Sequence, residues 1–174
     1  MTWPVAQLDR VARLRVLAEG VPGAVFREYR VDADFERAWS VLTDLEHSVP
    51  IYDGQVTRFE VVERSPSADG AGERLRARVR VSRWTGPLTQ RFQVDLSPGW
   101  CWMVGDAQLY LVGMAAEPDP AGTGTRLAHL EGIPLPTARS LRRFVALGLR
   151  ALRRLHAHHV DGDVRRIIRL IDRR

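Results

Sequence analysis

One stretch of the chain, residues 137–159, most constrains the fold because its pattern fits a long amphipathic helix. At about 100° per residue its apolar positions fall on one line, which runs through Leu141, Val145, Gly148, Leu152, Leu155 and His159. Arginines occupy the opposite side. A helix of about 23 residues is roughly 35 Å long, and an eight-residue strand is roughly 26 Å long. Such a helix can lie across a whole sheet, and its apolar side has to be buried there.

Most of the upstream chain alternates with the period of two that strands have. Residues 73–83 are the clearest case, since apolar side chains alternate there with arginines. One face of the sheet is therefore apolar and the other polar, which is typical of an antiparallel sheet. The predicted order is a helix over 4–19, a strand over 25–32, a helix from Asp34 that closes at 47–54, strands over 56–64, 73–83, 88–96, 100–105, 108–116 and 125–133, and then the long helix.

The end of the chain carries a second apolar stripe, formed by Val164, Ile167, Ile168 and Ile171. This stripe lies about 130° round the helix from the first one, and Gly162, between two aspartates, stands at the change of phase. Glycine is a poor residue for a helix interior and aspartate is a good N-cap. We therefore expect a break at 161–163 and a short terminal helix that docks on the domain body or on a second copy of the chain, as in a homodimer.

The composition fits one domain without disulfides. The 174 residues are 45% hydrophobic, which suits a single domain over 1–174 with a helical extension at 1–23, a core at 24–160 and the terminal helix at 161–174. No apolar run has the length of a membrane span and no leader pattern begins the chain, so a cytoplasmic protein is expected. Cys101 is the single cysteine, which excludes an internal disulfide. Its tryptophan neighbours favour a buried, small apolar residue.

The charge indicates little about partners. The net charge is +5 and every basic residue is an arginine. These arginines are spread over strands and helix, which favours genomic base composition as their cause and argues against a nucleic-acid partner. Contact with an anionic membrane surface is an alternative, because arginines cover one side of the long helix.

Several segments together resemble the START-like (SRPBCC) superfamily, which includes polyketide cyclases, the Bet v 1-like plant ligand binders and lipid-transfer domains. Residues 31–46 resemble the strand-to-helix entry of bacterial members, and Pro50, Gly72, residues 124–127 and the closing amphipathic helix also match. The resemblance covers residues 24–160. It implies an α+β helix-grip fold, in which a seven-stranded antiparallel sheet grips the long C-terminal helix around a cavity for sterols, lipids, hormones or polyketides. The N-terminal helix and the short terminal helix are extra to that pattern.

The last predicted strand carries the strongest candidates for chemistry. Leu127, His129 and Glu131 share a face of this strand, so both polar side chains point inward if Leu127 does. A buried His–Glu pair has perturbed proton affinities and could act as general acid and base on a carbonyl compound. The alternative is a register change or bulge that turns both residues outward.

The histidines near the end of the long helix are a weaker candidate. His156, His158 and His159 with Asp161 and Asp163 have the spacing of a metal cluster, but His158 points elsewhere on the helical wheel and the expected break separates Asp163. We therefore predict no metal site and interpret His159 as a hydrogen-bonded cavity or core histidine. No phosphate-binding or dinucleotide-binding glycine motif occurs, so no cofactor is predicted.

Arg83, at the end of its strand, either binds a ligand anion at a cavity mouth or is simply solvated. The aromatase members of the superfamily place an arginine and a tyrosine in the cavity. Arg91 is the nearest match but its strand turns it outward, and Tyr52 is only roughly placed, so the resemblance to the cyclases is weaker at these positions.

The preferred hypothesis is a protein that binds a hydrophobic or amphipathic small molecule, lipid-like or polyketide-like. The predicted lining comprises Tyr29, Tyr52, Phe59, Leu75, Val79, Val81, Arg83, Phe92, Trp102, Leu127, His129, Glu131, Val145, Gly148 and Leu152. A close approach by ligand or strand would explain a glycine at 148 inside a helix. The alternative is an enzyme of the polyketide cyclase, aromatase or dehydratase kind that uses His129 and Glu131. A third hypothesis is a peripheral module whose arginine-covered helix lies on anionic lipid or nucleic acid.

Overall fold

The structure is a computed structural model, and it describes residues 7–21, 23–68, 70–81, 88–106, 110–133 and 139–173. In the last helix, only the side chains of Gly148, Arg154 and residues 156–173 are described. The strands are β1 (Val25–Val31), β2 (Val56–Pro66), β3 (Glu73–Val81), β4 (Leu88–Ser97), β5 (Trp100–Gly105), β6 (Leu111–Pro118) and β7 (Thr125–Gly132). The helices are α1 (Arg10–Glu19), α2 (Phe35–Thr43), α3 (Leu45–Tyr52) and α4 (Arg139–Arg173).

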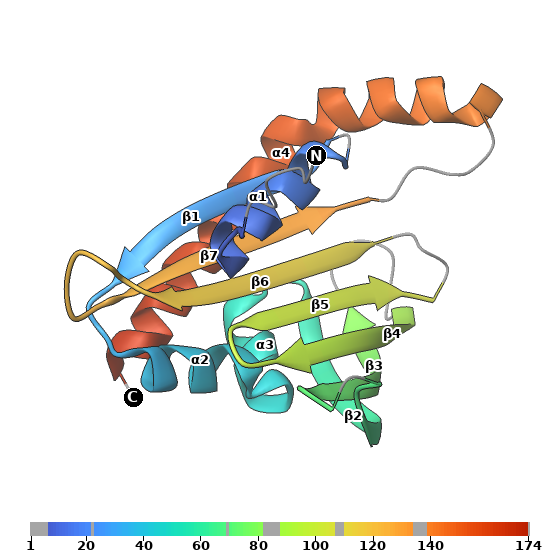
Figure 1. Cartoon of the computed structure of the whole chain (residues 1–174). Coiled ribbons are helices and arrows are strands. Elements are labelled where there is room, and N and C mark those ends of the chain that lie inside the picture. Colours follow the sequence, from blue (N-terminus) through green and yellow to red (C-terminus); the bar gives the residue numbers. More distant parts are fainter. Residues whose placement is uncertain are drawn as a thin grey trace, which may run out of the picture.

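The strands form one antiparallel sheet in the order β1-β7-β6-β5-β4-β3-β2 (Figure 1). Each strand from β2 to β7 pairs with the next one along the chain, and β1 pairs with β7 at the edge of the sheet. This is the predicted seven-stranded antiparallel sheet with a C-terminal helix, and its strand ends lie within a few residues of those that the alternation predicts. The fold class is therefore confirmed.

The inner face of the sheet packs against α2, α3 and the C-terminal half of α4. On β3 the side chains of Leu75, Ala77 and Val79 are buried while the arginines between them are exposed, as the alternation predicts. Ile167 and Ile171 of α4 are fully buried in the same core. Burial of this apolar face, at about 25 cal/mol per Å², is the main force that holds the helices on the sheet.

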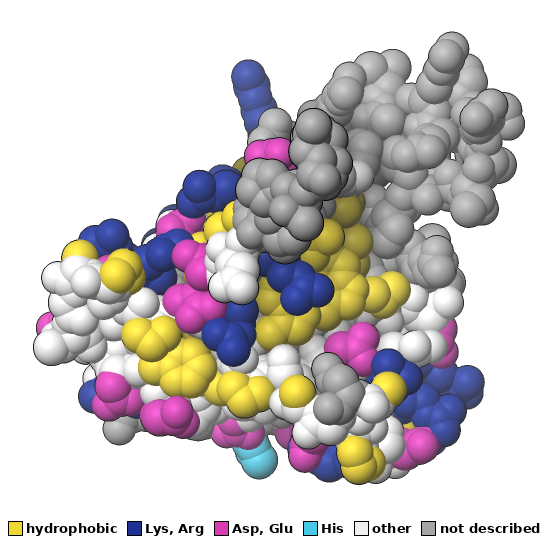
Figure 2. Space-filling view, in the orientation of Figure 1, with side chains coloured by type: hydrophobic (Ala, Val, Ile, Leu, Met, Phe, Trp, Pro, Cys, Tyr) yellow, Lys and Arg dark blue, Asp and Glu magenta, His cyan; other side chains and the backbone are white. Residues whose placement is uncertain are grey.

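The outer face carries a second core beneath α1. Val11 and Leu14 of α1 are fully buried against residues of β6 and β7. Beside them the Trp100 and Trp102 rings stack with centroids 6.2 Å apart, and the Arg13 guanidinium lies 4.9 Å from the centroid of the Trp100 ring. Figure 2 views this side, with α1 in front of the sheet as in Figure 1, and shows hydrophobic side chains gathered at the centre of the face. The middle of the sheet is consequently covered on both sides.

The expected break at 161–163 is wrong. α4 runs without interruption from Arg139 to Arg173, with Gly162 inside it. The change of stripe does not need a break, because the two halves of one helix can face different surroundings. Figure 1 shows the N-terminal turns of α4 extending away from the sheet, whereas the C-terminal half lies against β1. Burial of Ile167 and Ile171 offsets the cost of about 1 kcal/mol for an interior glycine.

The stripe predicted from Leu141 to Leu155 lies outside the described side chains, apart from Gly148. Gly148 is exposed, and no atom of the described residues lies within 4 Å of a Cβ built on it. Of the two explanations for this glycine, a close approach by a strand is not found among the described residues, because this part of α4 extends beyond the sheet, and a close approach by a ligand stays a prediction. The arginines on the other side of the same turns stay a prediction.

Two other helices have ends that differ from the predicted ones. The sequence predicts the N-terminal helix from Pro4, but α1 begins at Arg10, where the side chain of Asp9 accepts a hydrogen bond from the Ala12 amide (2.7 Å) and caps it. The segment expected to close the second helix instead forms α3, which holds Pro50 inside it. Burial of its apolar residues outweighs the helix-breaking tendency of proline. Among the described helices, none is both long and apolar enough to cross a membrane.

Candidate functional site

A cavity of about 330 Å³ lies between the inner face of the sheet, α3 and α4. This volume is at the lower end of the range for small-molecule sites, about 300–1,000 Å³. Leu88 on its wall is 52% exposed, so the cavity reaches the surface beside β4. The wall comprises Val49, Tyr52, Asp53, Gln55, Val56, Phe59, Val79, Val81, Leu88, Gln90, Phe92, Met103, Tyr110, Val112, His129, Glu131 and His159.

The wall is apolar on one side and ionisable on the other. Strands β2 to β5 contribute mostly valine, leucine, phenylalanine and methionine, which are the inward positions of their alternation. The ionisable side chains come from β7, α4, the end of α3 and the segment before β6. A ligand in this cavity therefore meets an apolar surface and one polar end.

His129 and Glu131 form a buried pair at the polar end. Both side chains are 2% exposed, and His129 Nε2 lies 2.8 Å from Glu131 Oε1. Both point inward, as the alternation predicts, and no bulge interrupts the pairing of β7 with β1 or β6. Burial alone would lower the pKa of His129, but the hydrogen bond to Glu131 and the charge of that carboxylate outweigh it and raise the pKa.

The second carboxylate oxygen of Glu131 accepts further hydrogen bonds. Tyr110 donates its hydroxyl hydrogen bond to Oε2, and His156 Nε2 lies 3.2 Å from the same atom. Burial would raise the pKa of Glu131, but the hydrogen bonds from His129, His156 and Tyr110 outweigh it and hold the pKa well below its usual value. The pKa of Tyr110 is raised by burial and by the neighbouring Glu131 charge. Glu131 is therefore an ionised, fully engaged carboxylate that positions the groups round it.

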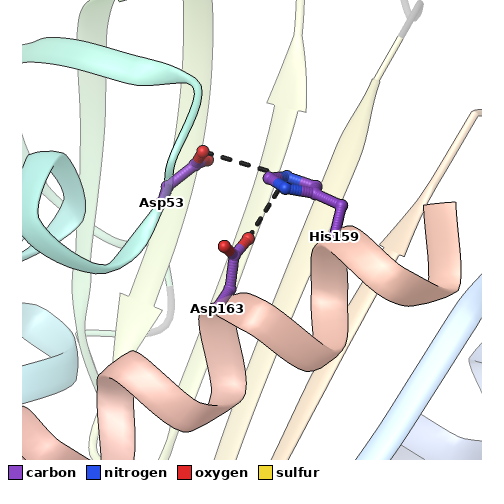
Figure 3. A group of neighbouring side chains, drawn as sticks. All are labelled: Asp53, His159 and Asp163. Carbon is purple, nitrogen blue, oxygen red and sulfur yellow. Dashed lines mark ion pairs between the residues drawn. The ribbon is translucent and has the colours of Figure 1, made fainter. Parts of the chain in front are cut away.

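A second group of ionisable side chains adjoins the first (Figure 3). His159 Nε2 lies 3.2 Å from Asp163 Oδ2, one turn further along α4, and 3.9 Å from Asp53 Oδ1, which follows α3. The same nitrogen lies 3.8 Å from Glu131 Oε2. Three carboxylates thus surround one imidazole nitrogen.

The carboxylates of this group repel one another. Burial and the charge of Glu131 raise the pKa of Asp53. Burial, with the charges of Asp53 and Glu131, raises the pKa of Asp163 to about 8. Arg166 opposes this, since it contacts Asp163 Oδ1 and its Nε donates to the Tyr52 carbonyl at 2.6 Å. These contacts fasten α4 to the end of α3 and place Asp163 beside the cavity.

The structure brings part of the predicted lining to the cavity. On the wall are Tyr52, Phe59, Val79, Val81, Phe92, His129 and Glu131. Tyr29, Leu75 and Leu127 lie in the inner core away from the wall, and Gly148 is exposed. Arg83 and the side chains of Val145 and Leu152 lie outside the described part of the chain.

The placement of Trp102 in the cavity is wrong. Cys101 and Met103 are the inward side chains of β5, so Trp100 and Trp102 point to the outer face and pack beside α1. The alternation of β5 is clear, but both of its faces are apolar, and the prediction places the larger side chains on the wrong one. Cys101 is fully buried, as expected.

Several wall residues escape prediction from the sequence. The residues around Asp53 indicate only a turn, and Tyr110 lies in the strand predicted over 108–116 with nothing that marks it as a wall residue. The predicted lining also lacks the other wall residues, Val49, Gln55, Val56, Leu88, Gln90, Met103 and Val112. Among these additional wall residues, the sequence marks only His159, which we interpret from the sequence as a cavity or core histidine.

Comparisons with known proteins identify the fold. No protein-family model matches the chain, and no curated protein matches it. Among solved structures, the Zhui aromatase/cyclase from Streptomyces sp. R1128 matches 87% of this chain and 94% of its own, with a TM-score of 0.63 and 17% identity. TTHA0849 from Thermus thermophilus matches 84% and 98%, with a TM-score of 0.54 and 21% identity. Ara h 8.0201 matches 87% and 98%, with a TM-score of 0.51 and 10% identity. At these identities the likeness shows the fold alone.

Proposed function

We propose that this chain, which has the START/polyketide cyclase-like helix-grip fold, binds a hydrophobic small molecule that carries a polar group. The observation that carries this proposal is a ring nitrogen of the buried His129 that lacks a hydrogen-bond partner among the described residues. It is 1% exposed and lies on the cavity wall, yet its Nδ1 makes no hydrogen bond within the described residues. A buried donor without a partner costs about 1–3 kcal/mol, and an oxygen of the ligand would remove that cost.

The two ends of the cavity have separate roles in this proposal. The apolar part of the ligand packs against Phe59, Val79 and Phe92, where each Å² removed from water contributes about 25 cal/mol. The polar group, a carbonyl or hydroxyl, accepts a hydrogen bond from His129 Nδ1. Glu131 holds His129 in the protonated form that makes this donor available, because its carboxylate accepts from Nε2.

A second candidate, an aromatase/cyclase-like enzyme, is favoured by the same pair. The Zhui protein is described as an aromatase/cyclase. Here an imidazolium held by Glu131 can pass its Nδ1 proton to the carbonyl oxygen of a bound ligand and act as a general acid. His129→Gln distinguishes the two candidates: a carrier loses affinity at most, whereas an enzyme keeps its affinity and loses turnover.

A fluorescence titration with 1-anilinonaphthalene-8-sulfonate tests the binding proposal. Leu88→Trp narrows the mouth of the cavity at an exposed position, so it can be made without loss of the core. Thr89→Trp is the matched control, because it adds the same ring one residue along β4 on the exposed side of the strand.

We expect the Leu88→Trp variant to weaken binding of the dye and the Thr89→Trp variant to bind it as the wild type does. Equal binding by all three proteins, or no binding by the wild type, would mean that the cavity is not the binding site. Circular dichroism of each variant checks that the fold is retained.

A further inference from the structure

The geometry points to a binding site for a divalent first-row transition-metal ion, formed by Asp53, His159 and Asp163 at the polar end of the cavity. One carboxylate oxygen of each aspartate and one ring nitrogen of the histidine lie within 4.8 Å of one another. Figure 3 shows the three side chains turned toward a common point between α4 and the segment after α3. Two carboxylates and an imidazole are donors that zinc, manganese and iron accept.

The contacts of His159 support an ion rather than a hydrogen-bonded histidine. Its Nε2 makes ion-pair contacts with carboxylate oxygens at 3.2, 3.8 and 3.9 Å, but none of these contacts is a hydrogen bond in the described structure. An imidazole that served only as a hydrogen-bond donor would aim its N–H at one of these oxygens. Donors that lie close together without aiming at each other are the arrangement that surrounds a metal ion.

Asp163 carries a buried oxygen without a hydrogen bond, in the described part of the chain, on its side that faces His159. The residue is 0% exposed and its Oδ2, the oxygen that faces His159, has no hydrogen-bond partner among the described residues. Its other oxygen contacts Arg166. A buried carboxyl oxygen is rarely left without a hydrogen-bond partner in a protein interior, because the loss of hydration is not compensated.

The distances fit a small divalent ion. Donors at about 2.0–2.2 Å from a tetrahedral ion lie about 3.3–3.6 Å from each other. The 3.2 and 3.9 Å separations that join His159 to the two aspartates lie on either side of that range. The third separation, between the two aspartates, is at most 4.8 Å, so an ion would draw the three donors together by rotation of their side chains.

The charge of the neighbourhood also favours a cation. Asp53, Glu131 and Asp163 bring three carboxylates together; Arg166 contacts Asp163, and His129 and His156 contact Glu131. Because Asp53 and His159 also lie on the cavity wall, an ion bound here would face the cavity. Three protein donors leave at least one coordination position for water or for an oxygen of a ligand. The metal site does not depend on the ligand-binding proposal, since its donors are complete without a ligand.

Titration of the full chain with Co²⁺, after dialysis against a chelator, tests this site. Co²⁺ replaces Zn²⁺ in such sites and gives visible d–d absorption bands when carboxylate and imidazole donors bind it. We expect one Co²⁺ per chain, its displacement by Zn²⁺, and a melting temperature that rises on addition of Zn²⁺ because the ion binds the folded state.

His159→Ala should weaken Co²⁺ affinity by about 100-fold or more, since even residues behind the ligands typically contribute about 10–100-fold. Asp53→Asn should also weaken it, and this variant keeps an oxygen that can accept from the Gln55 and Val56 amides, so its fold is expected to persist. His158→Ala is the matched control, because His158 is an exposed neighbour on the same helix.

Three results would overturn the metal site. One is the absence of Co²⁺ binding by the wild-type chain. Another is wild-type affinity in Asp53→Asn, which decides the matter even if His159→Ala does not fold. The third is loss of binding in His158→Ala, which would assign the ion to histidines on the exposed side of α4.

Discussion

Replacing Glu131 with glutamine tests the polar end of the cavity through its effect on stability. Glu131 is 2% exposed and receives contacts from His129, His156 and Tyr110. The amide that replaces it has no charge to hold the His129 imidazolium, and its NH₂ group faces donors. Removal of one partner from a buried charge pair costs about 3–5 kcal/mol.

That loss is measurable by urea and thermal unfolding. For a chain of this length each kcal/mol shifts the melting temperature by about 2–4 °C, so Glu131→Gln should lower it by about 6–20 °C. Glu63→Gln is the matched control, since Glu63 pairs with Arg76 on the surface, with the two side chains 51% and 66% exposed. An exposed pair of this kind is worth about 0–1 kcal/mol.

A double variant tests the physical reason. Replacing both His129 and Glu131 with leucine removes the charges together, and such a replacement of a whole buried pair is often close to neutral. It should therefore be less destabilising than Glu131→Leu alone. A Glu131→Gln variant as stable as the Glu63→Gln control would refute the account of Glu131 as a buried, fully engaged carboxylate.

Three further predictions concern the rest of the fold. Burial raises the pKa of Cys101 to about 12, so the thiol should resist alkylation by iodoacetamide at pH 8 in the native protein and react in urea; fast native labelling would contradict its buried position. Asp9→Ala removes the N-cap of α1 and should lower the free energy of unfolding by about 0.5–2 kcal/mol, and an unchanged urea midpoint would mean that α1 is not docked on the sheet. Gly124→Ala should destabilise by about 1–3 kcal/mol, because its Cβ would lie 2.4 Å from the Val31 carbonyl oxygen; a neutral result by thermal unfolding would contradict the close approach of these two segments.

The sheet could be predicted from the sequence because its signal is local. Alternation over β3 and β7 indicates which side chains face inward, and this was sufficient to bring His129 and Glu131 together. The same signal failed for Trp102, because α1 covers the outer face and makes both sides of β5 apolar. Alternation separates two faces of a strand, but it does not identify which of two buried faces borders the cavity.

The rest of the candidate site depends on contacts between distant segments. Asp53, Tyr110 and His159 meet only when the end of α3, the segment before β6 and the second half of α4 are packed together. Nothing in the local sequence of Asp53 or Tyr110 indicates this. The expected break at Gly162 also concealed the proximity of His159 and Asp163, which lie one turn apart because packing of the helix end keeps α4 continuous.

The central claim is that the cavity between the sheet and α4 binds a small hydrophobic ligand whose polar group is directed at His129. Native mass spectrometry of the full chain, purified without detergent, tests it most directly by looking for a retained small molecule. The account predicts a single adduct per chain that is lost on unfolding and depleted in Leu88→Trp but not in Thr89→Trp. A bare chain in every preparation, together with no uptake of 1-anilinonaphthalene-8-sulfonate, would contradict it.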